Sequence, residues 1–374
     1  MNKKFLAIAV AAAMAPVAAS ADVKLYGIAQ VEYSVEDSSA NGVDSVQAVD
    51  DNGGRSRIGI KFTEKLGGGL TAFGKAEFRI DPADNSSQGT NGNATSVSGA
   101  LGQRDIHVGL KSSWGSLAAG SFNSPYKTAG GVKWDPWAAS HLQARRAGGM
   151  SGGAGIGGHN GFIRNAIYYT SPSVNGFQAQ FSISPDETNA GAENGPDGDN
   201  DYSIALQYKN GPWHAIFAHN RNNNDSNAVA GATEDETLTK VGLRWKSGAL
   251  TIAGQYEVIS DADRAASGNT PGGGGTAEAY HAGTVGAGQN DADILWLNGQ
   301  YKAGNNIFTV SYGQTDVDGA GANPDADYDM WTVGVIHKFS KQTRIFGGYT
   351  QTDGDNNGNA DDRDAFSVGI RKDF

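Results

Sequence analysis

Polar and apolar residues alternate with a period of two along most of the chain. In residues 176–184, for example, Phe177, Ala179, Phe181 and Ile183 alternate with polar side chains. Such a pattern predicts a β-strand with one apolar and one polar face. A bundle of membrane helices is excluded, because it needs several apolar runs of about 20 residues and the one long apolar run is residues 5–21.

Sixteen segments carry this strand pattern, and most are near the length that a tilted membrane strand needs, about 9–11 residues. We predict strands over residues 23–33, 54–64, 70–80, 103–111, 115–121, 162–170, 176–184, 201–209, 212–221, 236–246, 249–259, 293–302, 305–315, 329–339, 341–350 and 364–374.

The connections between these segments alternate between short and long. Seven are short turns, such as Asn210-Gly211 and Ser247-Gly248, and eight are long: 34–53, 81–102, 122–161, 185–200, 222–235, 260–292, 316–328 and 351–363. Short turns at one end and long loops at the other are typical of a bacterial outer-membrane barrel. We therefore predict an all-β fold, a transmembrane antiparallel barrel of 16 strands with short periplasmic turns and eight long outer loops. Its apolar faces meet lipid and its polar faces line the lumen.

The N-terminus reads as a secretory signal peptide. Lys3 and Lys4 precede an apolar run that ends in Ala19-Ser20-Ala21, small residues where a signal peptidase cuts. We predict that residues 1–21 are cleaved and that residues 22–374 form a single barrel domain. Export fits a protein of the cell outer membrane.

Composition removes several other classes of protein. The chain has no Cys, which excludes a disulfide scaffold and a thiolate zinc site, and its net charge of −11 argues against nucleic acid as a partner. The 54 Gly suit turns, loop tips and strand bends. The acids are gathered in the long loops other than 122–161, and most Lys and Arg lie in the strands. The pattern indicates an acidic outer surface on a basic barrel.

The whole mature chain resembles the general diffusion porins of Gram-negative outer membranes, which are trimers of sixteen-stranded barrels. The resemblance lies in the segments 23–27 (VKLYG), 57–61 (RIGIK), 104–110 (RDIHVGL) with 114–117 (WGSL), 164–172 (RNAIYYTSP), and in the terminal Phe374. It implies a homotrimer, and it implies that Phe374 is a signal to the barrel assembly machinery. It also implies that the third long loop folds into the lumen and narrows it.

The resemblance further implies a basic cluster that faces the third loop, formed by Arg57, Arg104 and Arg164. A fourth position that is often basic in such porins is Ile28 here, so the cluster is partly depleted. The constriction loop itself carries Lys127, Lys133, Asp135, Arg145 and Arg146, an excess of cations. Period two places further cations on lumen faces: Lys61, Lys75, Arg79, Arg244, Lys302 and Arg344. A low-dielectric wall focuses the field of such charges, so we expect the constriction to prefer anions.

Two features of the strands concern the outside of the barrel. Aromatic residues near strand ends suggest interfacial girdles; they are Tyr26, Trp114, Tyr168, Tyr169, Trp213, Trp245, Trp331 and Tyr349. Small residues on strands 70–80 and 115–121 suggest close subunit packing; they are Ala72, Gly74, Ala76, Ala118 and Gly120.

Other motifs carry little chemistry. Residues 149–153 match a nucleophile elbow and residues 153–158 a dinucleotide fingerprint, but both lie in a Gly-rich loop without the strand and helix that those motifs need. The histidines show no metal-ligand spacing, and we predict no metal and no cofactor. A weak calcium candidate combines Asp353, Asp355, Asn357, Asp361 and Asp364.

We therefore expect an outer-membrane porin that forms a water-filled channel for passive diffusion of small hydrophilic solutes and ions. Lipid and lipopolysaccharide would surround it. One alternative is a substrate-selective porin for sugars or phosphate, in which Trp134 and Trp137 would begin an aromatic ladder for a sugar. The other is a barrel hydrolase that uses Ser151.

Overall fold

The structure, a computed structural model, describes residues 21–38, 43–50, 56–80, 82–83, 102–145, 147–151, 161–185, 200–222, 235–264, 288–318, 326–356, 359–360 and 362–374. The predicted signal peptide therefore lies almost wholly outside the described residues. No helix within these ranges is long and apolar enough to cross a membrane.

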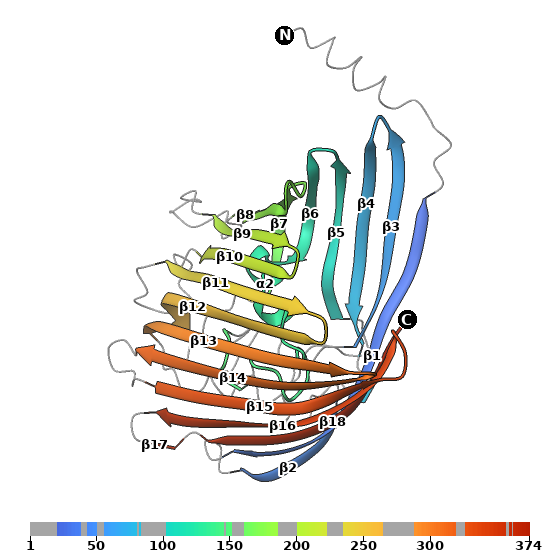
Figure 1. Ribbon diagram of the computed structural model, residues 1–374. Coiled ribbons are helices and arrows are strands. Elements are labelled where there is room, and N and C mark those ends of the chain that lie inside the picture. Colours follow the sequence, from blue (N-terminus) through green and yellow to red (C-terminus); the bar gives the residue numbers. More distant parts are fainter. Residues whose placement is uncertain are drawn as a thin grey trace.

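The described chain forms one antiparallel sheet of 18 strands that closes on itself. Its strands are β1 (Asp22–Ser38), β2 (Val43–Asp50), β3 (Arg57–Gly67), β4 (Leu70–Arg79), β5 (Gly102–Ser112), β6 (Gly115–Asn123), β7 (Phe162–Thr170), β8 (Phe177–Ser184), β9 (Asp201–Asn210), β10 (Trp213–Asn222), β11 (Glu236–Ser247), β12 (Leu250–Arg264), β13 (Gly288–Ala303), β14 (Asn306–Asp318), β15 (Ala326–Lys338), β16 (Thr343–Asn356), β17 (Asn359–Ala360) and β18 (Arg363–Asp373). In Figure 1 they curve round an interior that holds α2 (Pro125–Thr128).

The predicted barrel of sixteen strands is confirmed, because two pairs of these strands share one place in the wall. β1 pairs with β2 along its second half and with β3 along its first half, so β2 and β3 are two pieces of one barrel strand. In the same way β17 and β18 both pair with β16. The barrel closes where β1 meets β18 from Ile28↔Asp373 to Ser38↔Arg363.

Several strands continue beyond their predicted ends. β1 and β2 extend into the predicted loop 34–53, and β16 extends to Asn356 in the predicted loop 351–363. Apolar alternation stops where the lipid stops, but ladder hydrogen bonds do not need apolar side chains. The hairpins therefore continue past the membrane surface without a hydrophobic signal.

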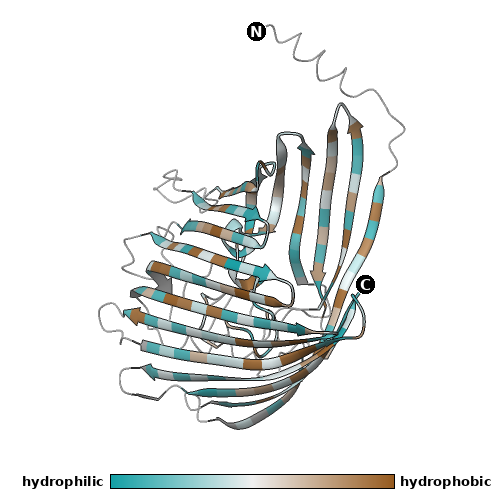
Figure 2. Cartoon of the chain, in the orientation of Figure 1, coloured by the Kyte–Doolittle hydropathy of each residue, from teal (hydrophilic) through white to brown (hydrophobic). Residues whose placement is uncertain are grey.

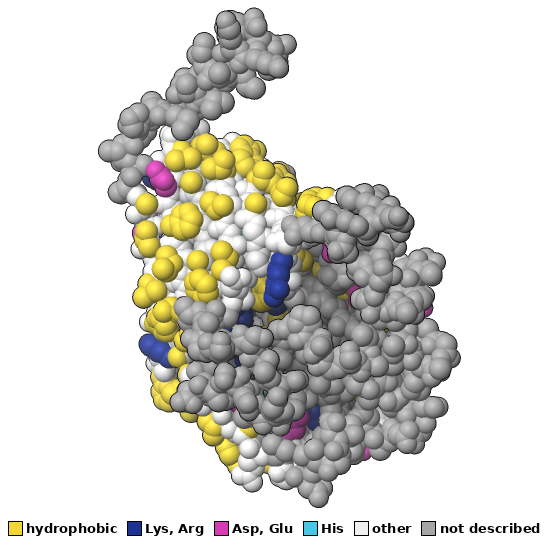
Figure 3. All heavy atoms as spheres, turned by 180° about the vertical axis from the view of Figure 1, so that it is seen from behind, with side chains coloured by type: hydrophobic (Ala, Val, Ile, Leu, Met, Phe, Trp, Pro, Cys, Tyr) yellow, Lys and Arg dark blue, Asp and Glu magenta, His cyan; other side chains and the backbone are white. Residues whose placement is uncertain are grey.

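The barrel is apolar outside and polar inside. On β14 the outward Phe308, Val310 and Tyr312 are exposed, whereas the inward Thr309 and Ser311 are buried. Figure 2 shows the two classes alternating along the strands, and Figure 3 shows hydrophobic side chains gathered over the outer face. Exposed apolar side chains in such number are the lipid-facing surface of a membrane barrel.

Four residues expected to face outward instead face the lumen. Tyr26 donates a hydrogen bond to the inward Glu77, and Tyr168 packs on Phe122 with ring centroids 5.2 Å apart. Ala118 lies in the inner cluster that Phe122 forms, and Gly120 occupies the same face of β6. For Ala118 and Gly120 the expectation failed because β6 has small or apolar residues on both faces, so period two alone does not say which face meets lipid.

The C-terminal residue helps to close the barrel. Phe374 N donates to Gly27 O (3.1 Å), and Gly27 N donates to Phe374 O (2.9 Å). A Cβ added to Gly27 would lie 2.2 Å from the Phe374 ring, so only glycine leaves room for this ring. The predicted role of Phe374 as an assembly signal stays a prediction, and its ring covers the seam between the first and last strands.

Candidate functional site

The chain after β6 turns into the barrel and packs on the lumen wall. Ser124 begins the turn: its hydroxyl accepts from Lys127 N (3.0 Å), and Pro125 follows at the first helical position of α2. A 3-10 helix, η1 (Gly131–Lys133), comes next. The side chains of Tyr126 and Leu142 in this segment are fully buried. We call the described residues 124–145 and 147–151 the inner loop.

The inner loop is bound to both sides of the lumen. Near its start, Tyr126 N donates to Ser203 on β9 (3.1 Å), and the Tyr126 hydroxyl donates to Glu257 on β12 (2.7 Å). Burial, and then the Glu257 charge, raise the pKa of this hydroxyl well above its ordinary value, so it remains a donor. Near its end, Ala147 O accepts from Thr352 on β16 (2.9 Å). The loop thus crosses the barrel interior.

Two predicted functions of loop residues do not fit this packing. Trp134 and Trp137 are buried, Trp134 against His214 and Arg244 and Trp137 against Phe346. Buried rings do not present a stacking surface to a passing sugar. Ser151 is also buried, and its hydroxyl donates to Glu257. These three residues fix the loop to the wall.

The opposite part of the wall, on β3 to β5, carries a cluster of five charges that we call the wall cluster. Lys75 Nζ lies 3.3 Å from Glu77 Oε2 and 2.6 Å from Asp105 Oδ2. Arg104 Nε lies 2.9 Å from Glu77 Oε1, and Arg57 Nε lies 3.6 Å from Glu77 Oε2. Glu77 therefore binds three cations at once.

A β-bulge explains why Arg104 and its neighbour Asp105 both reach this cluster. The pairing of β4 with β5 shifts register between Ala76 and Phe78, opposite residues 103–106. A bulge places two residues of one strand opposite one of its partner and re-aims their side chains. The same bulge removes the plain alternation of residues 104–110 in the sequence.

Two more predicted cations lie close to the aromatic rings of Tyr26 and Phe162. Lys61 is exposed with Nζ 4.4 Å from the centre of the Tyr26 ring. Lys127 Nζ lies 4.6 Å from the Phe162 ring, which also lies 5.1 Å from the Arg104 guanidinium. Lys127 thus brings the inner loop to the wall cluster.

The remaining predicted site residues lie apart from the wall cluster or have other contacts. Arg164 is exposed on β7, and its side chain makes no ion pair with a described residue. Arg79 pairs across strands with Arg57. Asp135 accepts from Trp137 N (2.9 Å) and Ala144 N (3.0 Å), so it holds the fold of the inner loop.

Three loop cations complete the predicted set. Lys133 is exposed at the end of η1. Arg145 donates to Gln143 Oε1 (3.2 Å) within the loop. Arg146 lies outside the described residues. The described part of the inner loop therefore carries several cations, and of these Lys127 shares the Phe162 ring with Arg104 of the wall cluster.

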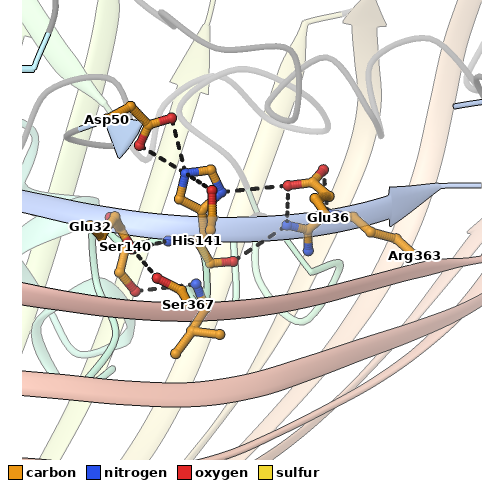
Figure 4. Close-up of polar contacts among 9 residues, drawn as sticks. Glu32, Glu36, Asp50, Ser140, His141, Arg363 and Ser367 are labelled. Atoms are coloured by element: carbon orange, nitrogen blue, oxygen red, sulfur yellow. Dashed lines mark hydrogen bonds and ion pairs between the residues drawn. The ribbon is translucent and has the colours of Figure 1, made fainter. Parts of the chain in front are cut away.

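A second charged group, which sequence reasoning missed, joins the tip of the inner loop to β1, β2 and β18. Figure 4 shows His141 between Asp50, Glu32 and Glu36. His141 Nε2 lies 2.9 Å from Asp50 Oδ1, and His141 N donates to Glu32 Oε2 (3.1 Å). Arg363 donates to both oxygens of Glu36, each at 2.9 Å. We call these five residues the tip cluster.

The tip cluster corrects part of the expected charge distribution. Glu36 and Asp50 were assigned to the acidic outer surface, but they face inward and contact His141. Glu77 and Asp105 also neutralise part of the positive charge on the barrel wall. A signal for Glu77 was present, because it shares the period-two face of Lys75 and Arg79. No local signal joins His141 to residues about a hundred positions away.

The weak calcium candidate is not assembled in the described part of the chain. Asp353, Asp355 and Asp364 are exposed at the ends of β16 and β18, and Asn357 and Asp361 lie outside the described residues. Within the ranges described, the group of three ligand side chains that lies close enough for one ion is Glu32, Asp50 and His141.

Removing Arg363 is expected to destabilise the barrel. Its side chain is fully buried and Glu36 is 18% exposed, so Arg363→Gln costs about 2–4 kcal/mol, toward the lower end of the effect of breaking a buried ion pair. The more exposed pair Arg221–Asp235, with side chains 26% and 29% exposed, supplies the control, and Arg221→Gln should cost less than about 1 kcal/mol. The measurement is the free energy of unfolding in urea. Equal losses in the two variants would contradict the buried ion pair.

Comparisons with known proteins agree with this architecture. A family model described as Gram-negative porin matches residues 7–357. The major outer membrane protein P.IB of Neisseria gonorrhoeae is 28% identical over 362 residues, which cover 92% of this chain and 91% of that protein.

Two solved structures show the same fold. An anion-selective porin from Comamonas acidovorans has a TM-score of 0.72 at 21% identity, covering 95% of this chain and 100% of that one. The trimer form of in-vitro folded OmpT from Vibrio cholerae has a TM-score of 0.60 at 17% identity, covering 95% and 100%. The family model spans nearly the whole sequence, and the resemblance drawn from the motifs is confirmed: the chain belongs to the Gram-negative porin family and lies in the outer membrane.

Proposed function

We propose that this porin forms a water-filled channel for passive diffusion of small hydrophilic solutes and ions, with a preference for anions where the inner loop faces the wall cluster. A barrel of sixteen strands leaves an aqueous lumen that side chains do not fill. The inner loop occupies one part of that lumen, and the wall cluster lies across from it. Permeating ions pass between the two.

The observation that carries the anion preference is the depth of the charges in the wall cluster. The side chains of Arg57, Lys75 and Arg104 are 17–22% exposed, whereas those of Glu77 and Asp105 are 5% and 9% exposed. The carboxylates lie beneath the cations, so water in the channel meets positive charge first. A narrow opening in a low-dielectric wall focuses the field of such charges on passing ions.

Further positive charge surrounds the opening. Lys127 comes from the inner loop and Lys61 from β3. The similar fold of an anion-selective porin supports the same preference, although the tip cluster supplies opposing negative charge elsewhere in the lumen.

We also propose that the chain assembles as a homotrimer. Ala72, Gly74 and Ala76 lie on the outward face of β4, because they pair across strands with the outward Phe62 and Ile60 face of β3. Small outward residues permit close approach of a second barrel. The trimer form of the structurally similar OmpT supports this assembly.

The zero-current potential across a planar bilayer in a salt gradient tests the ion preference. The anion-selective sign is expected for the wild-type porin. Arg57→Gln with Arg104→Gln should move the potential toward cation selectivity, because two water-facing charges are lost. Arg164→Gln is the matched control for Arg104→Gln alone, because each removes one charge. Arg164→Gln should have the smaller effect, since Arg164 does not contact the wall cluster. A cation-selective wild type would overturn the proposal.

A further inference from the structure

Three side chains of metal-ligand type meet where the inner loop touches the barrel wall. Glu32 comes from β1, Asp50 from β2 and His141 from the loop tip, and one ligand atom of each lies within 4.8 Å of the others. Figure 4 shows Asp50 and Glu32 on two sides of the imidazole. Glu32 and Asp50 pair across β1 and β2, and the fold brings His141 to them from a distant part of the sequence.

The distances suit a small ion. His141 Nε2 lies 2.9 Å and 3.1 Å from the two carboxylate oxygens of Asp50. Two ligands at the tetrahedral angle on an ion with bonds of ~2.0 Å lie ~3.3 Å apart. An ion between His141 and Asp50 therefore needs only small side-chain shifts.

Glu32 supplies a buried oxygen without a partner. The residue is 1% exposed, and its Oε2 accepts from Ser367 Oγ (2.6 Å) and His141 N (3.1 Å). Its Oε1 is buried and has no hydrogen-bond partner among the described residues. An unsatisfied buried carboxylate oxygen is costly, and a third bond to the ion would satisfy it.

The imidazole is oriented for metal binding. Glu36 Oε2 lies 3.5 Å from His141 Nδ1, and Arg363 holds Glu36 through both of its oxygens. In the contact with Asp50 the imidazole donates through Nε2. An ion bound at Nε2 would displace that proton, and the proton on Nδ1 would then face Glu36. A carboxylate behind a ligating histidine is the usual arrangement in metal sites, because it fixes the ring and the tautomer.

The charges in the tip cluster also call for a divalent cation. Arg363 pairs with Glu36, and Glu32 and Asp50 place two further carboxylates beside His141. Like charges at this distance are unfavourable in a buried setting. One divalent ion balances them.

We propose that Glu32, Asp50 and His141 bind a divalent transition-metal ion of the Zn²⁺ class, which clamps the inner loop to the barrel wall. One nitrogen and two carboxylate ligands suit Zn²⁺, whereas Ca²⁺ and Mg²⁺ prefer sites made only of oxygen ligands. Water completes the coordination. The bound ion removes negative charge from the lumen, so it should strengthen anion preference. The metal site is independent of the proposed permeation function.

Calorimetric titration of the full mature porin in detergent, stripped with EDTA, tests the site with ZnCl₂. We expect one Zn²⁺ per chain, and we expect Glu32→Gln and His141→Gln each to weaken binding by about 10-fold or more. His219→Gln is the matched control, because His219 lies on β10 and contacts Thr239; its Zn²⁺ affinity should equal that of the wild type. Unchanged binding in His141→Gln, or no binding by the wild type, would overturn the proposal.

A second test measures the zero-current potential of the wild-type porin in a planar bilayer, so it does not depend on whether a variant folds. Adding Zn²⁺ should move the zero-current potential toward anion selectivity, and EDTA should reverse the shift. Ca²⁺ at the same concentration should cause a smaller shift than Zn²⁺. No shift with Zn²⁺ would overturn the clamp, whatever the sign of the resting selectivity. An equal shift with Ca²⁺ would assign the effect to acidic groups in general and would also overturn it.

Discussion

Glu77→Gln is expected to shift the zero-current potential strongly toward anions. Glu77 contacts the three cations of the wall cluster, Arg57, Lys75 and Arg104. Asp105 is the remaining carboxylate, so the charge of the five residues rises from +1 to +2. Because the field is focused across the narrowest opening, the ratio of anion to cation permeability should rise about twofold or more.

The measurement is the zero-current potential of the refolded variant in a salt gradient. Glu64→Gln is the matched control: Glu64 lies on β3 on the face opposite to Lys61, so its charge is outside the lumen. It should leave the potential unchanged. A Glu77→Gln channel with wild-type selectivity would show that the wall cluster does not face the ion path.

The same variant separates structure from selectivity. Tyr26 also donates to Glu77 (2.9 Å), and glutamine keeps an acceptor oxygen for that hydroxyl. The barrel ladder does not depend on the carboxylate, so the folded, heat-modifiable form should persist. Loss of folding together with loss of channels would place Glu77 among the residues that hold the wall together.

The barrel was predictable because its strands obey one rule. Thr309 and Ser311 alternate with Phe308 and Val310, and the same alternation recurs from β1 to β18. Lipid on one side and water on the other impose that pattern. Where both environments become aqueous the rule ends, which is why the ends of β1, β2 and β16 were missed.

The charged contacts were less predictable, and the reasons differ. The bulge that turns Arg104 and Asp105 inward depends on pairing with β4, which the local sequence of β5 does not encode. His141 meets Glu32 through a loop that crosses the lumen. Composition predicted a cationic loop. Which of its cations lies near the wall cluster depends on how the loop packs against the barrel, and buried rings such as Trp137 fix that packing.

Shortening the inner loop should have the largest effect on conductance, because we propose that this loop sets the size of the channel. Replacing residues 131–149 by a short Gly-Ser linker removes the part that crosses the lumen, while Ser124 and Tyr126 remain as anchors. Single-channel conductance should rise about twofold or more, because the diameter of a water-filled pore limits its conductance. Ion preference should weaken as the wall cluster comes to face a wider opening.

The barrel should still fold after this change, because its strands hydrogen-bond to one another. Side chains of the wall that lose their partners in the loop, such as Thr352, would hydrogen-bond to water instead. Tyr126→Phe with Ser151→Ala is the matched control. It removes two hydrogen bonds to Glu257 but keeps the loop, so conductance should stay near that of the wild type, with more current noise. Unchanged conductance in the shortened channel would mean that the narrowest point lies elsewhere, and both the wall cluster and the tip cluster would then lose their place in selectivity.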